Sequence, residues 1–116
     1  MHRTCFETSD CTIARSLEKV GEWWSILILR DAWLGRTRFD EFQKSLGIGS
    51  NTLTRRLNWL VDQGLLERRC YKEHPPRHDY VLTAAGRDFQ PVLQAFDAWG
   101  KVHALPIDAA SSSEAE

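Results

Sequence analysis

The sequence predicts a mainly α-helical fold of the α+β class, in which several helices are followed by one two-stranded hairpin and a last helical stretch. Apolar residues recur every three or four positions through most of residues 11–63, which is helical spacing. After Gly64 the period falls to two, and two consecutive prolines then interrupt it, which is typical of strands joined by an extended loop. The 116 residues, 42% of them hydrophobic, fit one folded domain.

The first two helices are predicted on either side of Gly21. Residues 1–10 are expected to form a flexible arm. The short helix after the arm has an apolar face made by Ile13, Leu17 and Val20. Residues 22–34 are apolar around most of their circumference, so we expect them to form the central buried helix.

Two further helices are separated by the glycine turn at residues 47–49. Residues 39–46 carry a short apolar face. Residues 51–63 follow the turn, and their buried stripe is predicted to consist of Leu53, Leu57 and Leu60. A short helix, a tight turn and an amphipathic helix make a helix-turn-helix unit, whose second helix enters the major groove of DNA.

The polar face of residues 51–63 is suited to reading DNA bases. Arginine can bind O6 and N7 of guanine together, asparagine can pair with adenine, and a threonine methyl group can contact the methyl group of thymine. We therefore predict groove contacts from Ser50, Asn51, Thr52, Thr54, Arg55 and Arg56. An ordinary amphipathic surface helix has a similar pattern, so this prediction depends on the hairpin that follows.

That hairpin is predicted to be a wing beside the helix-turn-helix unit. Residues 65–72 alternate as a strand, residues 73–77 form an extended loop and residues 78–82 return as the second strand. Contacts with phosphates or the minor groove are expected from Lys72, His74 and Arg77. Arg68 and Arg69 point to opposite faces, so one of them is expected to pair with an acidic side chain. Charges that solubilise an edge hairpin are the alternative explanation.

The end of the chain is predicted to be helical and then disordered. Thr83 caps the helical stretch, and Pro91 inside it predicts a kink or a fresh helix start. Residues 104–116 form a polar tail without core residues, which we expect to be disordered. The folded domain is therefore expected at residues 11–103, as a winged helix-turn-helix.

The distribution of charge is more informative than the net charge of −1. Between residues 36 and 77, nine Lys and Arg residues stand against five Asp and Glu residues. A basic middle between acidic ends suits a surface that binds a DNA duplex, although a solvated mixture of charges would look similar. Three cysteines with no apolar leader before them lead us to expect a reducing cytoplasm. The longest apolar run, residues 23–29, is too short to span a membrane.

Motifs for catalysis and metal binding are not found. The sequence has no Gly-x-Ser-x-Gly, no glycine-rich phosphate loop and no His-Glu-x-x-His. Cys5 and Cys11 are six residues apart, and His74 and His78 flank the two prolines, and neither spacing matches a zinc site. We therefore expect no enzymatic activity, no cofactor and no metal ion.

Residues 36–86 resemble the HxlR-type winged-helix regulators, relatives of the MarR group. The landmarks extend over residues 11–100 and include Arg38-Phe39, Asn51, Arg56-Leu57, Gly64-Leu65, Tyr71, Pro76, Tyr80, Leu82-Thr83, Gly86 and Trp99-Gly100. The resemblance implies a homodimer, built from the first and last helices, that binds double-stranded DNA at a pseudo-palindromic operator. It also implies transcription regulation in the cytoplasm, usually by repression.

The same resemblance draws attention to Cys11. Some members carry at this position a cysteine that senses oxidants or electrophiles, although here Thr12 replaces the proline that follows it, and Gly21-Glu22-Trp23 replaces the family's Gly-Gly-Lys-Trp. A helix N-terminus favours a thiolate, which raises reactivity. Cys11 is therefore a candidate redox sensor, and the alternative is a small packing residue. Cys70, inside a predicted strand, is expected to be structural.

Two alternatives concern the whole molecule. The aromatic residues are expected to form the core and the dimer interface, or else to line a pocket for a small-molecule effector; they are Trp23, Trp33, Phe89, Phe96 and Trp99. A winged helix can also bind another protein instead of DNA, because a fold does not fix a function.

Overall fold

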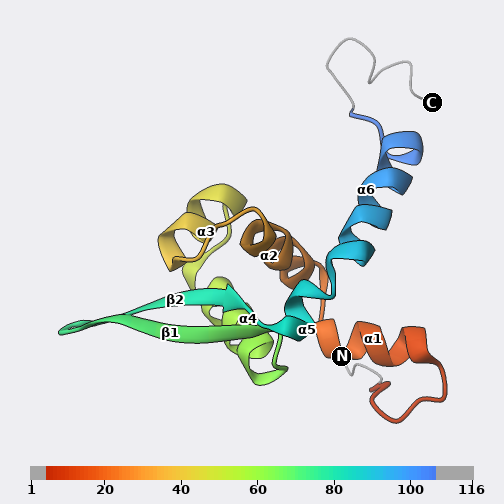
Figure 1. Cartoon of the computed structure of the whole chain (residues 1–116). Coiled ribbons are helices and arrows are strands. Elements are labelled where there is room, and N and C mark those ends of the chain that lie inside the picture. Colours follow the sequence, from red (N-terminus) through yellow and green to blue (C-terminus); the bar gives the residue numbers. More distant parts are fainter. Residues whose placement is uncertain (1–4, 107–116) are drawn as a thin grey trace.

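The computed structural model describes residues 5–106 and confirms the mainly α-helical winged helix-turn-helix fold. Within these residues the elements are α1 (Thr12–Val20), α2 (Trp23–Trp33), α3 (Phe39–Leu46), α4 (Ser50–Asp62), β1 (Leu66–Glu73), β2 (Pro76–Leu82), α5 (Ala84–Arg87) and α6 (Gln90–His103). In Figure 1 the hairpin projects from one side of the body formed by α2, α3 and α4, and α1 and α6 extend from the other side. The predicted arm and tail lie partly outside the described residues, at 1–4 and 107–116.

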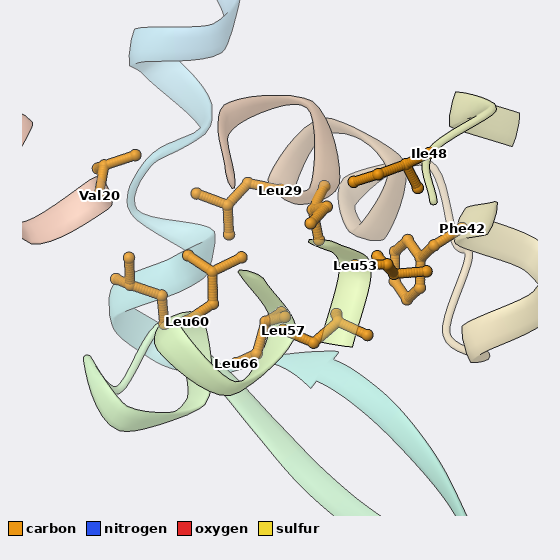
Figure 2. Close-up of a cluster of buried hydrophobic side chains, with 10 residues drawn as sticks. Val20, Leu29, Phe42, Ile48, Leu53, Leu57, Leu60 and Leu66 are labelled. Carbon is orange, nitrogen blue, oxygen red and sulfur yellow. The ribbon is translucent and has the colours of Figure 1, made fainter. Parts of the chain in front are cut away.

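The core lies where α2, α3 and α4 meet the base of the hairpin (Figure 2). The predicted leucine stripe is confirmed, because Leu53, Leu57 and Leu60 are fully buried. Phe42 of α3 and Ile28 of α2 pack in the same cluster. Each such side chain contributes about 1.5–3 kcal/mol to folding by leaving water. This burial fixes the rotation of α4 and so decides which of its side chains face solvent.

The prediction for α2 is correct on one face only. Ile28 and Leu29 are buried, but Trp23 is 70% exposed and Trp33 is 40% exposed. The expectation that α2 would be buried all round is therefore wrong. Trp23 lines the groove between α2 and α6.

The ends of the helices follow local rules. Gly21 ends α1 with a φ of 106°, which favours glycine, and a Cβ there would lie 2.8 Å from Nε1 of Trp59. The hydroxyl of Thr83 accepts a hydrogen bond from the Gly86 amide, so the predicted cap is confirmed. Pro91 stands in the first turn of α6, where proline is tolerated. The predicted last stretch is thus two helices, and Pro91 marks a fresh start.

The hairpin is an antiparallel pair whose base is buried and whose far end is exposed. Leu66 pairs with Leu82 at the base, and Glu73 pairs with Pro76 at the tip, so β2 begins two residues earlier than predicted. The register shifts between Cys70 and Lys72, which makes Tyr71 the extra residue of a bulge. Cys70 lies in β1 as predicted and is exposed, and its thiol donates to the Lys72 carbonyl at 3.1 Å.

Candidate nucleic-acid interface

The helix-turn-helix unit presents the predicted polar face of α4 to solvent. Gly47 ends α3 in the left-handed conformation, with a φ of 64°, and α4 begins directly after Gly49. The exposed residues at the start of α4 are Ser50, Asn51, Thr54 and Arg55, and Thr52 is half-buried. The Thr54 hydroxyl donates a hydrogen bond to the Ser50 carbonyl at 2.9 Å. Short polar groups therefore lead the helix, and they allow its backbone to approach a groove closely.

The two arginines of α4 have different surroundings. Arg55 is exposed and forms no ion pair with the described part of the chain. The Arg56 side chain is only 27% exposed, and its Nε lies 3.5 Å from Oε1 of Glu22 at the start of α2. Arg56 thus lies against an acidic residue of the same chain. Its groove contact stays a prediction, and such a contact would have to come from the guanidinium nitrogens other than Nε.

Arg68 and Arg69, near the base of the hairpin, have different partners. Arg68 donates a hydrogen bond to Oδ1 of Asn58 at 2.7 Å, which joins β1 to α4. Arg69 lies 3.2 Å from Glu67, which confirms that one of these arginines pairs with an acid. Neither arginine is therefore as available for DNA as the residues farther out.

The predicted wing residues lie at the far end of the hairpin. Lys72, His74 and Arg77 are all exposed, and the tip includes a cis peptide bond between His74 and Pro75. The hairpin in Figure 1 carries this end well away from the helices. Their exposure at this projecting end is compatible with the phosphate contacts predicted for them.

Sequence reasoning missed a group of contacts between the hairpin and the segment before α3. The Arg38 Nε lies 3.3 Å from Oδ1 of Asp79, and the Thr37 hydroxyl donates to the same oxygen at 3.1 Å. The Tyr80 amide donates to the Thr37 carbonyl at 2.7 Å. The hydrogen bond with Asp79 raises the pKa of Arg38. Arg38 was noticed only as a family landmark, because no local pattern pairs residues 41 positions apart.

The side chain of Glu41 holds the same segment from the other side. Oε1 of Glu41 accepts hydrogen bonds from the amides of Thr37, at 2.9 Å, and Arg38, at 3.1 Å. These backbone hydrogen bonds lower the pKa of Glu41. The first turn of α3 and the residues that contact the hairpin are therefore fixed together.

Cys11 stands at the N-cap of α1, as the candidate sensor role requires. It is exposed as a free thiol, and its amide donates to the Ser9 hydroxyl at 3.0 Å. Within residues 5–106 no three His, Cys, Asp or Glu side chains form a group that could hold a metal ion. In the same part of the chain, no helix combines the length and the apolar character needed to cross a membrane.

An apolar surface remains uncovered on the two outer helices. No residue of α6 is buried, and Phe96, Trp99 and Val102 are 57%, 63% and 67% exposed. On α1, Ile13 and Leu17 are 72% and 60% exposed. A groove of about 850 Å³ runs between α2 and α6. Phe96 and Trp99 are thus not core residues, and interface or pocket remain as their explanations.

Known proteins share this architecture and sequence. The family model for HxlR-like helix-turn-helix proteins matches residues 19–108. An uncharacterised HTH-type transcriptional regulator of Mycobacterium tuberculosis is 45% identical over 89 residues, covering 77% of this chain and 56% of that protein. The chain therefore spans little more than half the length of this relative.

Two solved structures are informative neighbours. The crystal structure of PA1607, assigned as a transcription factor, superposes with a TM-score of 0.80 at 41% identity, over 89% of this chain and 72% of that chain. The redox regulator HypR in its reduced form has a TM-score of 0.73 at 28% identity, over 79% of this chain and 92% of that chain.

Proposed function

Because this chain belongs to the HxlR-like helix-turn-helix family, we propose that it is a transcription regulator that binds double-stranded DNA as a homodimer and represses from a pseudo-palindromic operator. One observation carries the proposal. The leucines of α4 are fully buried, so Asn51, Thr54 and Arg55 face solvent at the start of a helix that the Arg68–Asn58 contact joins to the wing. A regulator of this kind works where the DNA is, so we expect it in the cytoplasm.

The homodimer is supported by the exposed apolar face of α1 and α6. Large apolar patches on a monomer are unfavourable in water, and burying them contributes about 25 cal/mol per Å². A two-fold axis would use the same face on both copies and would present two α4 helices to one duplex. The groove between α2 and α6 lies beside this face, and a small apolar effector bound there would change how the copies meet.

The experiment that tests DNA binding is a selection of bound duplexes from a random pool, followed by titration of the selected sequence. A dimer that makes about 6–10 phosphate contacts should lose roughly 10³–10⁵ in affinity between 50 and 200 mM salt. A winged-helix module that binds only proteins would enrich no sequence and bind no duplex. That result would replace the proposal with the protein-interaction alternative.

We also propose that Cys11 makes DNA binding sensitive to oxidation. Its support is an exposed thiol at a helix N-terminus and the similarity to HypR, a redox regulator. Mild oxidant should weaken operator binding, and Cys11→Ser should abolish the response. Cys70→Ser is the matched control, because Cys70 is also an exposed thiol but lies on the hairpin. A full response in Cys11→Ser would remove Cys11 as the sensor.

A further inference from the structure

We propose that Arg38 and Asp79 form a clamp that sets the angle of the hairpin against the helix-turn-helix unit, so that both act as positioning residues for DNA binding. The role rests on the function proposed above, because the angle matters only if the wing and α4 must reach one duplex. Neither residue was among the predicted DNA contacts, and both belong to segments that lie outside α4.

Arg38 joins α3 to both strands of the hairpin. It is the N-cap of α3, and its Nε lies 3.3 Å from Oδ1 of Asp79 in β2. Its guanidinium carbon lies 4.0 Å from the centre of the Tyr71 ring in β1. Tyr71 is the bulge residue, and bulges re-aim side chains out of the regular alternation. One side chain therefore holds the start of the helix-turn-helix unit to two strands.

Asp79 receives a second donor from the same segment. The Thr37 hydroxyl donates to Oδ1 of Asp79 at 3.1 Å, and the Thr37 carbonyl accepts the Tyr80 amide at 2.7 Å. The carboxylate thus accepts charge-assisted hydrogen bonds from two consecutive residues. The segment is itself fixed by Glu41, so the hairpin is attached to a rigid point.

The clamp contacts the hairpin beyond its buried base, where a contact can limit rotation of the hairpin about that base. The base of the hairpin is held by the buried Leu65 and Leu66. Asp79 lies three residues before Leu82, roughly 10 Å along its strand, and Tyr71 lies five residues beyond Leu66, roughly 16 Å along its strand. The hydrogen bond from Arg68 to Asn58 joins the hairpin to α4 near its base, and the contacts of Arg38 with Asp79 and Tyr71 add an attachment to α3 that limits pivoting about the base. The predicted contacts Lys72, His74 and Arg77 lie beyond this attachment.

The substitution Asp79→Asn distinguishes the clamp from a direct phosphate contact by Arg38, because the two roles predict opposite changes in affinity for DNA. Asp79→Asn removes the negative charge opposite Arg38 and leaves a neutral amide oxygen as the acceptor, so the contact with Arg38 is weakened. If charge alone matters, affinity for DNA rises. If Arg38 and Asp79 position the wing, operator affinity falls, by about threefold to tenfold. Asp79→Glu keeps the charge and should recover part of the loss.

Two further variants sharpen this test. Glu73→Gln is the matched control, because it removes one negative charge from the same hairpin at a residue that forms no ion pair with the described chain. It should leave operator affinity equal or higher. Arg38→Ala combined with Asp79→Asn should cost no more than the larger single change, because both remove the same contact.

A measurement without DNA separates the clamp from the function it serves. Hydrogen exchange of the Tyr80 amide reports its bond to Thr37, and in Asp79→Asn it should become at least about fivefold faster while the amides of α4 keep their protection. Unchanged exchange would overturn the clamp, as would faster exchange with unchanged operator affinity. If the native protein bound no duplex, the proposed function would fail while the exchange result still decided whether the clamp exists.

Discussion

Neighbouring residues of α4 show how one step along a helix changes what a side chain can do. Each residue turns the helix by about 100°. Arg56 therefore meets Glu22 on the side of α2, whereas Arg55 stands in solvent. Trp59, one turn after Arg55, donates from Nε1 to the Lys19 carbonyl at 2.9 Å and holds α4 to the end of α1. Arg55 is thus the arginine of α4 that is free to read a base.

Arg55→Ala should cost about 1–3 kcal/mol in binding to the selected operator if Arg55 contacts a base edge. Fluorescence titration against operator and random duplexes measures the change. Equal losses on both duplexes would assign Arg55 to a phosphate instead. Arg56→Ala is the comparison, and it should lower thermal stability as well, because it removes the cationic partner of the half-buried Glu22 and leaves that carboxylate, within the described residues, only its hydrogen bond from the Ser25 amide.

Glu41 should give the protein a pH-dependent stability that Glu41→Gln lacks. Its folded pKa is lowered, so its contribution is complete above the ordinary value of 4.5 and is lost as the pH falls through the lowered pKa. Thermal unfolding between pH 6 and pH 3 measures this. Glutamine can still accept in a capping box, so the variant should be close to the native protein near pH 6 and should lose less stability on acidification. If the melting temperatures of the native protein and Glu41→Gln fell equally between pH 6 and pH 3, the pH-dependent contribution assigned to Glu41 would be contradicted.

At the scale of elements, the short helix α5 is fitted tightly against the hairpin. A Cβ on Gly86 would lie 2.1 Å from the Leu65 carbonyl oxygen and 3.1 Å from Cδ2 of Leu82. The Thr83 hydroxyl accepts from the Gly86 amide and donates to the Gly64 carbonyl at 2.6 Å. The chain thus turns from β2 into α5 at a point where backbone meets backbone, which leaves no space for a side chain.

Gly86→Ala should therefore destabilise the fold by about 1–3 kcal/mol or more, because the obstacle is backbone and cannot rotate away. Chemical denaturation measures the free energy of unfolding. Gly100→Ala is the matched control in α6, where the nearest atom to a new Cβ is Cβ of Ala104 at 3.9 Å. Alanine there should be neutral or should stabilise the helix by about 0.5–1 kcal/mol. A tolerated Gly86→Ala would show that α5 can move.

At the scale of the whole molecule, the apolar side chains of α2, α3 and α4 form a buried core, whereas many of those on α1 and α6 are exposed. The winged body surrounds a buried core, whereas α1 and α6, which lie on the side away from the hairpin in Figure 1, have exposed apolar side chains. A dimer built on these helices would leave both wings and both α4 helices uncovered. The two α4 helices would then have to lie about 34 Å apart to enter successive major grooves.

If the protein is the homodimer proposed above, Phe96→Glu should convert it to a monomer, because the substitution places a charge in the apolar face of α6. Sedimentation equilibrium measures the mass, and operator affinity should fall by about 10²–10⁴-fold when the two half-sites are no longer held by one assembly. Gln94→Glu is the control, since it adds the same charge about 200° around α6. A native protein that is monomeric at all concentrations would contradict the dimer.

Local patterns were sufficient for much of this structure. The leucine spacing of α4, the glycines at 21, 47 and 64 and the alternation after Gly64 predicted the helices, their ends and the hairpin. These signals work because helix and strand periods and positive φ angles depend on neighbours in the sequence. The same patterns predicted the exposed start of α4, with Asn51, Thr54 and Arg55 among its residues.

Partners far apart in the chain were decided only by the tertiary structure. Arg38 and Asp79 meet across 41 positions, and Trp59 reaches Lys19 across 40. The exposure of Trp23, Phe96 and Trp99 likewise depends on which elements fail to cover them. By itself the sequence determined which segments are helix or strand and which face of each is apolar, because those properties repeat within one or two turns. Which charged side chains pair, and which apolar face stays open to a second copy, follow from packing between elements, for which a single sequence contains no periodic signal.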